Sequence, residues 1–218
     1  MQIVKAGYEI LDTLNGEEIL KKIEYIARKC YKSEDKITEG SAENMVRSLI
    51  KRGHEAMLEH FSFTVCFTVD RGVSHEIVRH RVASFAQEST RYCNYGSKAG
   101  EITVIDPCYL KADGEDMSLA QWGERYGAWV KACEESEKSY LIMLEDGATP
   151  EQARAVLPTS LKTEIVMTAN LREWRHFFKL RAVGVTGKPH PQMLEVTIPL
   201  LKELQIKIPV VFDDLVIE

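Results

Sequence analysis

Residues 60–70, HFSFTVCFTVD, alternate between apolar and polar side chains over their whole length. Successive side chains of a β-strand point to opposite faces, so a period of two predicts a strand here. One face of that strand would carry Phe61, Phe63, Val65, Phe67 and Val69. We therefore expect a sheet that packs this face against a hydrophobic core and turns the other face to a less apolar setting.

The rest of the chain reads mainly as helices, because apolar residues recur at helical spacing and capping residues precede several of the segments. We expect helices over 16–31, 42–53 (with Ser41 as N-cap), 73–82, 117–145, 149–158 (Thr149 as cap, Pro150 in the first turn), 170–181 and 191–204. Strands are expected within 2–13 and over 101–106 and 161–168, and a long ordered loop over 83–100. This order predicts an α+β fold: a single domain over residues 1–218, with helices around one small mixed or antiparallel sheet.

The 218 residues carry a formal net charge of −5, which argues against general affinity for nucleic acid or an anionic membrane. No apolar run approaches the roughly 20 residues of a membrane span, and the N-terminal segment lacks the apolar core of a signal peptide. The five cysteines are scattered, without a C-x-x-C pair: Cys30, Cys66, Cys93, Cys108 and Cys133. We expect a reduced, cytoplasmic protein in which any anion site is a local concentration of arginine.

Arginines and hydroxyls are concentrated in RHRVASFAQESTRY, residues 79–92. On a helix, Arg79 and Arg81 would point about 200° apart, so they would face two ligands rather than share one small anion. Downstream, Ser89, Thr90 and Arg91 combine hydroxyls, loop N–H groups and a guanidinium, which is typical of a phosphate cradle. The same pattern is compatible with a solvated basic helix end and a simple connecting loop.

A second cluster, NLREWRHFFKLR, occupies residues 170–181. On a helix, one stripe would hold Asn170, Trp174, Phe177, Phe178 and Arg181. The residues lying away from it would be Arg172, Arg175, His176 and Lys179. A guanidinium at the end of an apolar stripe is partly desolvated and needs an acceptor. That acceptor is either a ligand or an acidic residue elsewhere in the chain.

Two histidine pairs suggest a metal at first sight, but their spacing is wrong for one. His54 and His60 are six residues apart, and His75 and His80 are five apart. Histidines that share a zinc ion from one helix are four apart, as in H-E-x-x-H. We therefore predict no metal site, and keep a metal hydrolase built on His75, Glu76 and His80 as an alternative.

The segment RHRVASFAQES resembles the signature of the flavin-dependent thymidylate synthases, R-H-R followed by seven residues and a serine. The resemblance extends through RGHEAMLEH upstream, and through RAVLP (154–158) and NLREWRHFFKLR downstream, in the order of that family. It implies reductive methylation of dUMP to dTMP, with methylenetetrahydrofolate as carbon donor, NADPH as reductant and FAD as hydride carrier. It also implies an α+β homotetramer whose active sites are assembled from several subunits.

The resemblance also implies roles for individual residues. The FAD site would include Ala56, Glu59, Arg79, His80, Arg81, Gln87, Asn170, Arg172 and His176. The dUMP site would include Glu76, Arg79, Gln87, Glu88, Ser89, Thr90, Arg91, Arg154 and Arg181. Arg181 would be the catalytic group, next to the uracil ring, where it favours ionisation at N3. Ser89 is interpreted as a binding residue, and no cysteine receives a covalent role.

Two departures from the family pattern stand out. Ala56 falls where many members carry a hydroxyl, so a side-chain contact to flavin is lost there. The segment AVGVTGKPHPQ is longer than in compact members, and it brings His190 and Gln192 into consideration as groups that approach the flavin.

A different interpretation of the arginine segment, residues 79–92, is a module that binds RNA or single-stranded nucleic acid through charge and stacking. That module would use Arg79, Arg81, Phe85, Arg91 and Tyr92, and the acidic net charge disfavours it.

Overall fold

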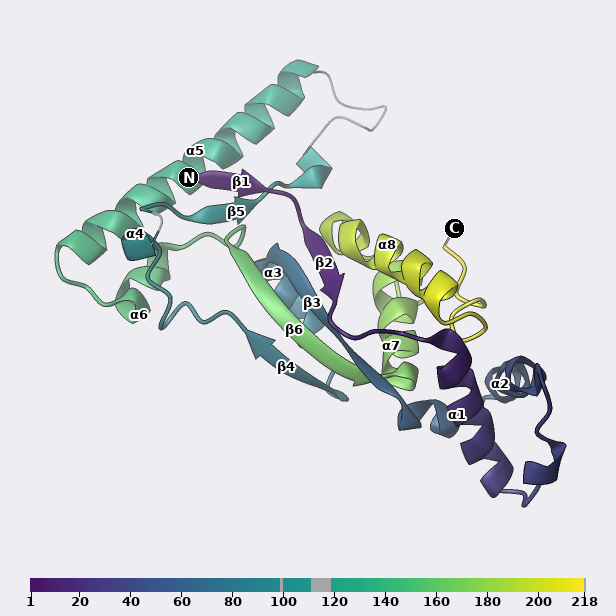
Figure 1. The fold of residues 1–218 in the computed structure, drawn as a ribbon. Helices are drawn as coiled ribbons and strands as arrows, with labels where there is room; N and C mark the ends of the chain where they lie inside the picture. Colours follow the sequence, from purple (N-terminus) through teal and green to yellow (C-terminus); the bar gives the residue numbers. More distant parts are fainter. Residues whose placement is uncertain (99, 111–118, 218) are drawn as a thin grey trace. The chain divides into compact units, whose positions relative to one another are not determined.

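The computed structural model describes residues 1–98, 100–110 and 119–217 (Figure 1). It confirms the α+β class, but the strands form two sheets where the sequence suggested one. β1 (Gln2–Val4) pairs in parallel with β5 (Thr103–Ile105). The other sheet has the strand order β2-β3-β6-β4, formed by β2 (Gly7–Ile10), β3 (Ser62–Asp70), β6 (Lys162–Asn170) and β4 (Ala83–Gln87). Among the helices of the described residues, none combines the length and the apolar character that a bilayer crossing requires.

The chain divides into two compact units. Unit 1 comprises Met1–Gly7, Phe67–Arg79 and Ala86–Ile165. Unit 2 comprises Tyr8–Cys66, His80–Phe85 and Val166–Glu218. β3, β4 and β6 each pass from one unit to the other part of the way along their length.

The alternation in β3 produces the buried face that the sequence predicted. Phe63, Val65, Phe67 and Val69 are at most 1% exposed, whereas the residues between them are partly exposed. β6 shows the same period, with Thr163, Ile165, Met167 and Ala169 buried. Within unit 2 the two strands are tied on their polar faces by the hydroxyls of Thr64 and Thr168, 3.0 Å apart. These strands carry the segments from which the candidate site residues project.

Unit 1 is built around the long helix α5 (Leu119–Glu145), which runs beside β1 and β5 (Figure 1). Its other helices are α3 (Arg71–Ile77), α4 (Tyr95–Lys98) and α6 (Pro150–Ala153), with 3-10 turns at Cys108–Leu110 and Arg154–Val156. A buried cluster joins Ile102, Val104, Cys133, Tyr140, Ala153 and Leu161. Thr149 caps α6 with a complete capping box and Pro150 in the first turn, as the sequence predicted.

Unit 2 contains α1 (Gly16–Lys29), α2 (Ser41–Lys51), α7 (Leu171–Phe178) and α8 (Pro191–Lys207). Short turns lie at Glu34–Lys36 and Glu55–His60. Helices α1 and α2 lie side by side (Figure 1). The core is aromatic: Trp174 stacks on Phe63 with ring centroids 4.8 Å apart, and Phe178 meets Phe212 edge to face. This packing fixes α7, the helix that presents most of the second sequence cluster.

The boundaries of several elements differ from those expected. The helix expected over 73–82 ends at Ile77, and the loop expected over 83–100 contains β4 and α4. The helix expected over 149–158 ends at Ala153 and continues as a 3-10 turn. Helix α8 runs to Lys207 despite Pro199, and residues 117–118, with which the helix expected over 117–145 would begin, lie outside the described residues.

Ser41 was expected to be an N-cap and is instead the first residue of α2, preceded by Gly40 with a positive φ of 75°. Its hydroxyl accepts from the N–H of Thr38 at 3.0 Å and donates to Glu24 at 2.8 Å. Glu24 is buried and also pairs with Arg28 at 2.9 Å. A contact with a buried carboxylate therefore overrides the local capping preference.

Candidate functional site

The segment around Arg181 in unit 2 has an unusual backbone. Asn170 caps α7 by accepting from the N–H of Glu173 at 2.9 Å, and the helix is regular up to Phe178. It then widens into a π-helical turn, Lys179–Val183, which ends at Gly184 with a φ of 78°. Such turns are rare and are frequently found at functional sites. Within this turn, the carbonyl of Arg181 accepts from the hydroxyl of Thr197 at 2.7 Å.

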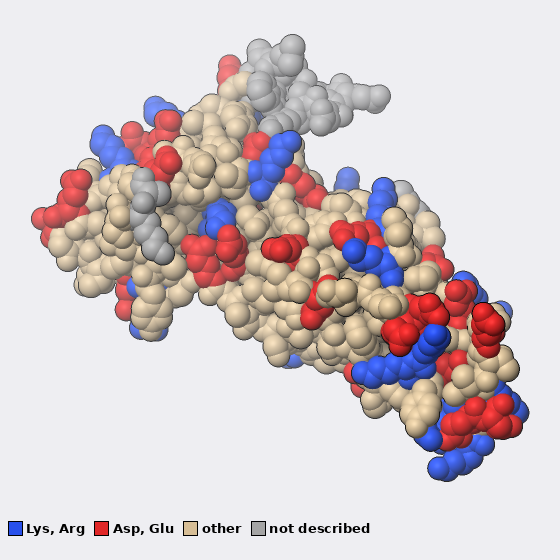
Figure 2. Space-filling model, viewed as in Figure 1, with Lys and Arg blue, Asp and Glu red and all other residues tan. Residues whose placement is uncertain are grey.

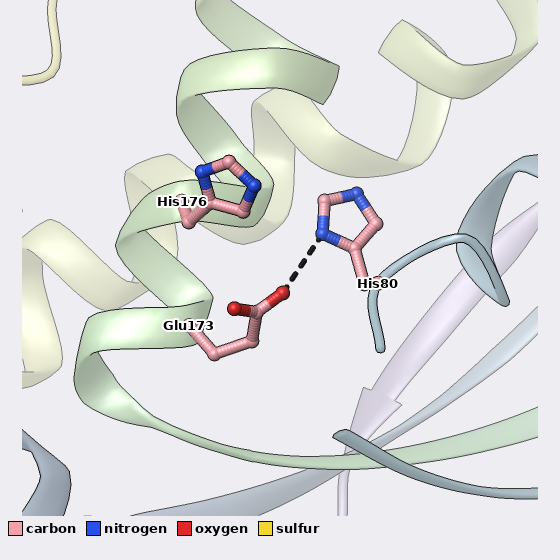
Figure 3. Close-up of side chains that lie close together, drawn as sticks. All are labelled: His80, Glu173 and His176. Carbon is pink, nitrogen blue, oxygen red and sulfur yellow. Dashed lines mark hydrogen bonds and ion pairs between the residues drawn. The ribbon is translucent and has the colours of Figure 1, made fainter. Parts of the chain in front are cut away.

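Arg181 reaches a buried histidine. Its Nε donates to Nε2 of His80 at 3.3 Å, and Nδ1 of His80 lies 3.0 Å from a carboxylate oxygen of Glu173. Figure 3 shows His80 and Glu173 facing each other, with His176 on the same helix as Glu173. His80 is 3% exposed and Glu173 is 8% exposed. One acceptor of the Arg181 guanidinium is therefore an imidazole within unit 2.

The pKa of His80 is lowered, chiefly because burial disfavours the charged ring, with the charges of Arg181 and His176 acting the same way. Glu173 opposes these effects without reversing them. A neutral imidazole has one donor and one acceptor nitrogen. The network assigns the donor to Nδ1, facing Glu173, and the acceptor to Nε2, facing Arg181.

His80, Glu173 and His176 also have the spacing of a metal site, because their ligand atoms lie within 4.8 Å of one another. Among the described residues, this grouping differs from the alternative considered above, which joined His80 to His75 and Glu76. A cation bound here would have to replace the hydrogen bond at one nitrogen of His80 and stand near the guanidinium of Arg181. Coulomb repulsion from Arg181 therefore disfavours such an ion.

A cavity of about 410 Å³ in unit 2 adjoins this cluster. It is lined by Glu55, Glu59, Val82, Asn170, Arg172, Glu173, His176 and Lys179. Four of these, Glu59, Asn170, Arg172 and His176, were predicted to contact FAD. The volume lies within the ~300–1,000 Å³ typical of ligand pockets. Guanidinium, ammonium, imidazole and amide donors alternate here with three carboxylates, so the lining fits a ligand that, like a flavin ring, has both hydrogen-bond acceptors and donors.

Several side chains that line this cavity are held in place by ion pairs. Arg172 binds Glu59 at 2.5 Å, and both side chains are about half exposed. Lys179 lies 3.7 Å from Glu55, which also accepts from Nε of Arg175 at 3.3 Å. Ala56, in the same turn as Glu55 and Glu59, is exposed.

The burial of Arg175 differs from what the helical pattern predicted. Arg175 was assigned away from the apolar stripe, but its side chain is only 1% exposed. Its guanidinium donates to both carboxylate oxygens of Asp214 and to the carbonyl of Val211. These partners lie in the C-terminal segment, and they satisfy a buried charge that the helical pattern alone cannot place.

The flanking arginines of the R-H-R signature are both exposed. Arg79 and Arg81 lie beyond the end of α3 at Ile77, so the 200° separation expected of a helix does not apply to them. Glu76 is on the last turn of α3 and is partly exposed. On the face shown in Figure 2, basic and acidic side chains are intermingled, without the broad basic surface typical of nucleic-acid binding.

In unit 1, the segment from Gln87 to Arg91 is held by side chains of α3 and β6. Nε2 of Gln87 donates to Ser74 at 2.9 Å and to Thr163 at 3.3 Å. Nη1 of Arg71 donates to the carbonyl of Glu88 at 3.2 Å. The sequence interpretation missed Arg71 and Thr163, because they are far from the segment along the chain and belong to no motif.

Glu88 is an anchored carboxylate. Tyr95 donates its hydroxyl to Glu88 at 2.8 Å, and Lys162 lies 3.6 Å away. Burial is the main cause that raises the pKa of Tyr95, and the carboxylate adds to it, so the phenol remains a donor at neutral pH. Glu88 therefore has a defined position next to Ser89.

Two arginines make contacts at the end of this segment. Nη1 of Arg154 donates to the hydroxyl of Thr90 at 3.3 Å, and the N–H of Arg91 donates to the hydroxyl of Ser89 at 3.3 Å. Nε of Arg91 pairs with Glu151 at 2.9 Å, with both side chains about half exposed. Hydroxyls and guanidinium groups are the side chains that bind phosphates, and the guanidinium of Arg91 already has the carboxylate of Glu151 as an internal partner.

Sequence comparisons with known proteins identify one family. Residues 9–210 match the family model described as "Thymidylate synthase complementing protein". The chain is 35% identical to the flavin-dependent thymidylate synthase of Pyrococcus abyssi over 173 residues, 78% of this chain and 65% of that protein. It is 31% identical to the enzyme of that name from Corynebacterium glutamicum over 225 residues, 98% of this chain and 85% of that protein. The match thus spans about two thirds of the length of the Pyrococcus relative.

Solved structures share the fold. A UMP/dUMP methylase, PolB from Streptomyces cacaoi, bound with 5-Br UMP, superposes with a TM-score of 0.79 at 22% identity. The superposition covers 98% of this chain and 95% of the other.

Proposed function

Because the chain belongs to the thymidylate synthase complementing protein family, we propose that it methylates dUMP to dTMP as a flavin-dependent thymidylate synthase. We further propose methylenetetrahydrofolate as the carbon donor, NADPH as the reductant and FAD as the flavin. The observation that carries the proposal is the contact of Arg154 with Thr90, which together with Arg91 directly follows the serine of the R-H-R signature. The two guanidinium groups and the hydroxyls suit a nucleotide phosphate.

Most of the proposed dUMP contacts belong to unit 1, and Arg181 belongs to unit 2. In unit 1, Arg91 and Arg154 would bind the phosphate, with Ser89 and Thr90 donating hydroxyls. Gln87 and Glu88, fixed by Ser74, Thr163 and Tyr95, would orient the sugar and base. Glu76 and Arg79 are further proposed dUMP contacts.

Arg181 in unit 2 would stabilise negative charge at N3 of the uracil ring and so raise electron density at C5. A donor fixed before the reaction stabilises developing charge without reorganisation, which is the main electrostatic contribution of enzymes to catalysis. The hydrogen bonds to His80 and from Thr197 supply that preorganisation. This scheme needs no covalent bond between a cysteine and the nucleotide.

For FAD, the cavity of unit 2 supplies a fitting set of donors. Arg172, His176 and Glu59 line it, and Asn170 uses Oδ1 for the helix cap, so its ligand contact would come from its amide NH2. We propose Ala56, His80, Arg81, Arg79 and Gln87 as the remaining flavin contacts. A bound flavin would supply the hydride chemistry, while these side chains orient it.

We also propose a homotetramer with active sites assembled from several subunits, and a cytoplasmic location. The five cysteines are all free thiols, which suits a reducing compartment.

The proposal is tested by spectroscopy and product analysis. The purified protein should be yellow or take up FAD, and dUMP should raise its melting temperature because it binds the native state only. With NADPH and methylenetetrahydrofolate, dTMP should appear by mass spectrometry. A protein that stays colourless with excess FAD and ignores dUMP would not be this enzyme. A salt-sensitive gel shift with oligonucleotides, unaffected by dUMP, would favour nucleic-acid binding instead.

A further inference from the structure

Glu173 is a buried carboxylate that no sequence motif singled out. We infer that Glu173 is a positioning residue: it holds His80 as the Nδ1–H tautomer, so that Nε2 of His80 can accept from Nε of Arg181. The role of this Glu173–His80–Arg181 hydrogen-bond network in turnover rests on the proposed function. The tautomer assignment itself does not.

The backbone of α7 fixes the position from which the Glu173 side chain projects. Glu173 lies in the first turn of α7, where Oδ1 of Asn170 accepts from its N–H at 2.9 Å. Its side chain is 9% exposed, and the side chain of His80 is 2% exposed. An acceptor in so little water forms a stronger hydrogen bond than a solvated one, and leaving it unpaired is costly.

The choice of tautomer is decided by the two neighbours of the ring. Nδ1 faces Glu173, an acceptor, and Nε2 faces the N–H of Arg181, a donor. Only the Nδ1–H form satisfies both contacts. The reversed tautomer would set two N–H groups against each other at Nε2 and leave Nδ1 without a proton to donate to the carboxylate.

The ring itself cannot choose another orientation easily. Phe177 meets it edge to face with centroids 5.0 Å apart, and His176 does the same at 5.6 Å. The groups facing the imidazole that carry charge or titrate are Glu173, Arg181 and His176. Burial favours the neutral ring, which is the form that this chain of hydrogen bonds needs.

The consequence for Arg181 is that it is held from two sides. Its carbonyl accepts from Thr197, and its Nε is bound by His80. Glu173 acts on the second of these contacts only, and through the histidine. Loss of the carboxylate should therefore change how well Arg181 is oriented while its backbone stays in place.

The test measures the tautomer directly. In full-length protein labelled with ¹⁵N-histidine, without ligands and at pH 8, His80 should show a protonated Nδ1 and an unprotonated Nε2. A His80→Gln variant assigns the signals. Glu173→Leu, which removes the acceptor at similar volume, should shift His80 to the Nε2–H form or a mixture. Glu173→Gln retains an acceptor oxygen and should keep Nδ1–H. Glu134→Leu, the same change at an exposed helical position of unit 1, should have no effect.

Turnover supplies the second measurement. For dTMP formation, Glu173→Leu should lower kcat on the order of 100-fold, because misplacing a group by about 1 Å has that effect, with little change in the KM for dUMP. Glu173→Gln should remain within about tenfold of the wild type, the mild end of what altering a supporting residue does.

An Nε2–H tautomer in the wild type would overturn the inference, even if Glu173→Leu does not fold. So would an unchanged tautomer or an unchanged kcat in a folded Glu173→Leu, or a Zn²⁺ ion bound to His80 with Arg181 displaced. If the wild type makes no dTMP at all, the proposed function fails while the tautomer measurement stands.

Discussion

Nε of Arg181 lies 3.3 Å from Nε2 of His80, a residue 101 positions earlier in the chain. A lowered pKa keeps that histidine neutral, so the contact is a hydrogen bond to an uncharged acceptor. An ion pair with a carboxylate would partly neutralise the guanidinium. The contact with a neutral ring orients Arg181 and, unlike such an ion pair, does not itself neutralise the positive charge.

Replacing Arg181 with alanine should abolish most turnover and leave flavin binding intact. Removing one preorganised donor from a developing anion typically costs about 10²–10³ in kcat. We expect at least that loss in dTMP formation, with an unchanged flavin absorbance spectrum. Arg47→Ala, at an exposed arginine of α2, is the control. Normal turnover by Arg181→Ala would refute the N3 role.

Glu151→Gln should tighten the binding of dUMP. The carboxylate of Glu151 pairs with Arg91 at 2.9 Å and competes with a phosphate for it. Exposed pairs of this kind are worth about 0.2–1 kcal/mol, so the dissociation constant should fall up to about fivefold. Titration calorimetry measures the change, with Glu134→Gln as the control. Weaker binding by Glu151→Gln would indicate that this carboxylate contacts the nucleotide itself.

Arg175→Met should destabilise unit 2 strongly. The substitution leaves Asp214 and the carbonyl of Val211 without their donor, and breaking a buried pair costs about 3–5 kcal/mol. Because Asp214 is 49% exposed, we expect about 3 kcal/mol, measured by urea unfolding. Arg47→Met breaks a neighbouring exposed pair with Asp213 and should cost less than about 1 kcal/mol. Equal losses from both variants would contradict the assigned burial.

Stability should depend on pH through His80. Its folded pKa is lowered by burial, so the unfolded chain binds the proton more readily. The stabilisation is therefore fully present above the unfolded pKa of about 6.5 and is lost as pH falls below it. Unfolding free energies measured from pH 8 to pH 5 should decline more steeply in the wild type than in His80→Gln. The exposed His54→Gln variant should follow the wild type, and a parallel decline in His80→Gln would argue against this assignment.

Local patterns in the sequence determined the parts of the fold that depend on near neighbours. The period-two run placed β3, the threonine–proline pair placed the start of α6, and the helical spacing placed α1 and α7. The resemblance of the R-H-R segment and its downstream partners identified the family, which the family model confirms over residues 9–210. Strand alternation and helix caps are set by residues within a few positions of each other, so one chain is enough to read them.

The tertiary structure alone decided how the charged side chains are paired. The burial of Arg175 and the contact of Arg71 with Glu88 follow from partners outside the local segment. The same holds for the hydrogen bonds that link Glu173, His80 and Arg181. A buried polar group must find a partner wherever the fold brings one, because leaving it unpaired costs more than any local preference supplies. Periodicity therefore located these residues, and long-range hydrogen bonding decided what each of them does.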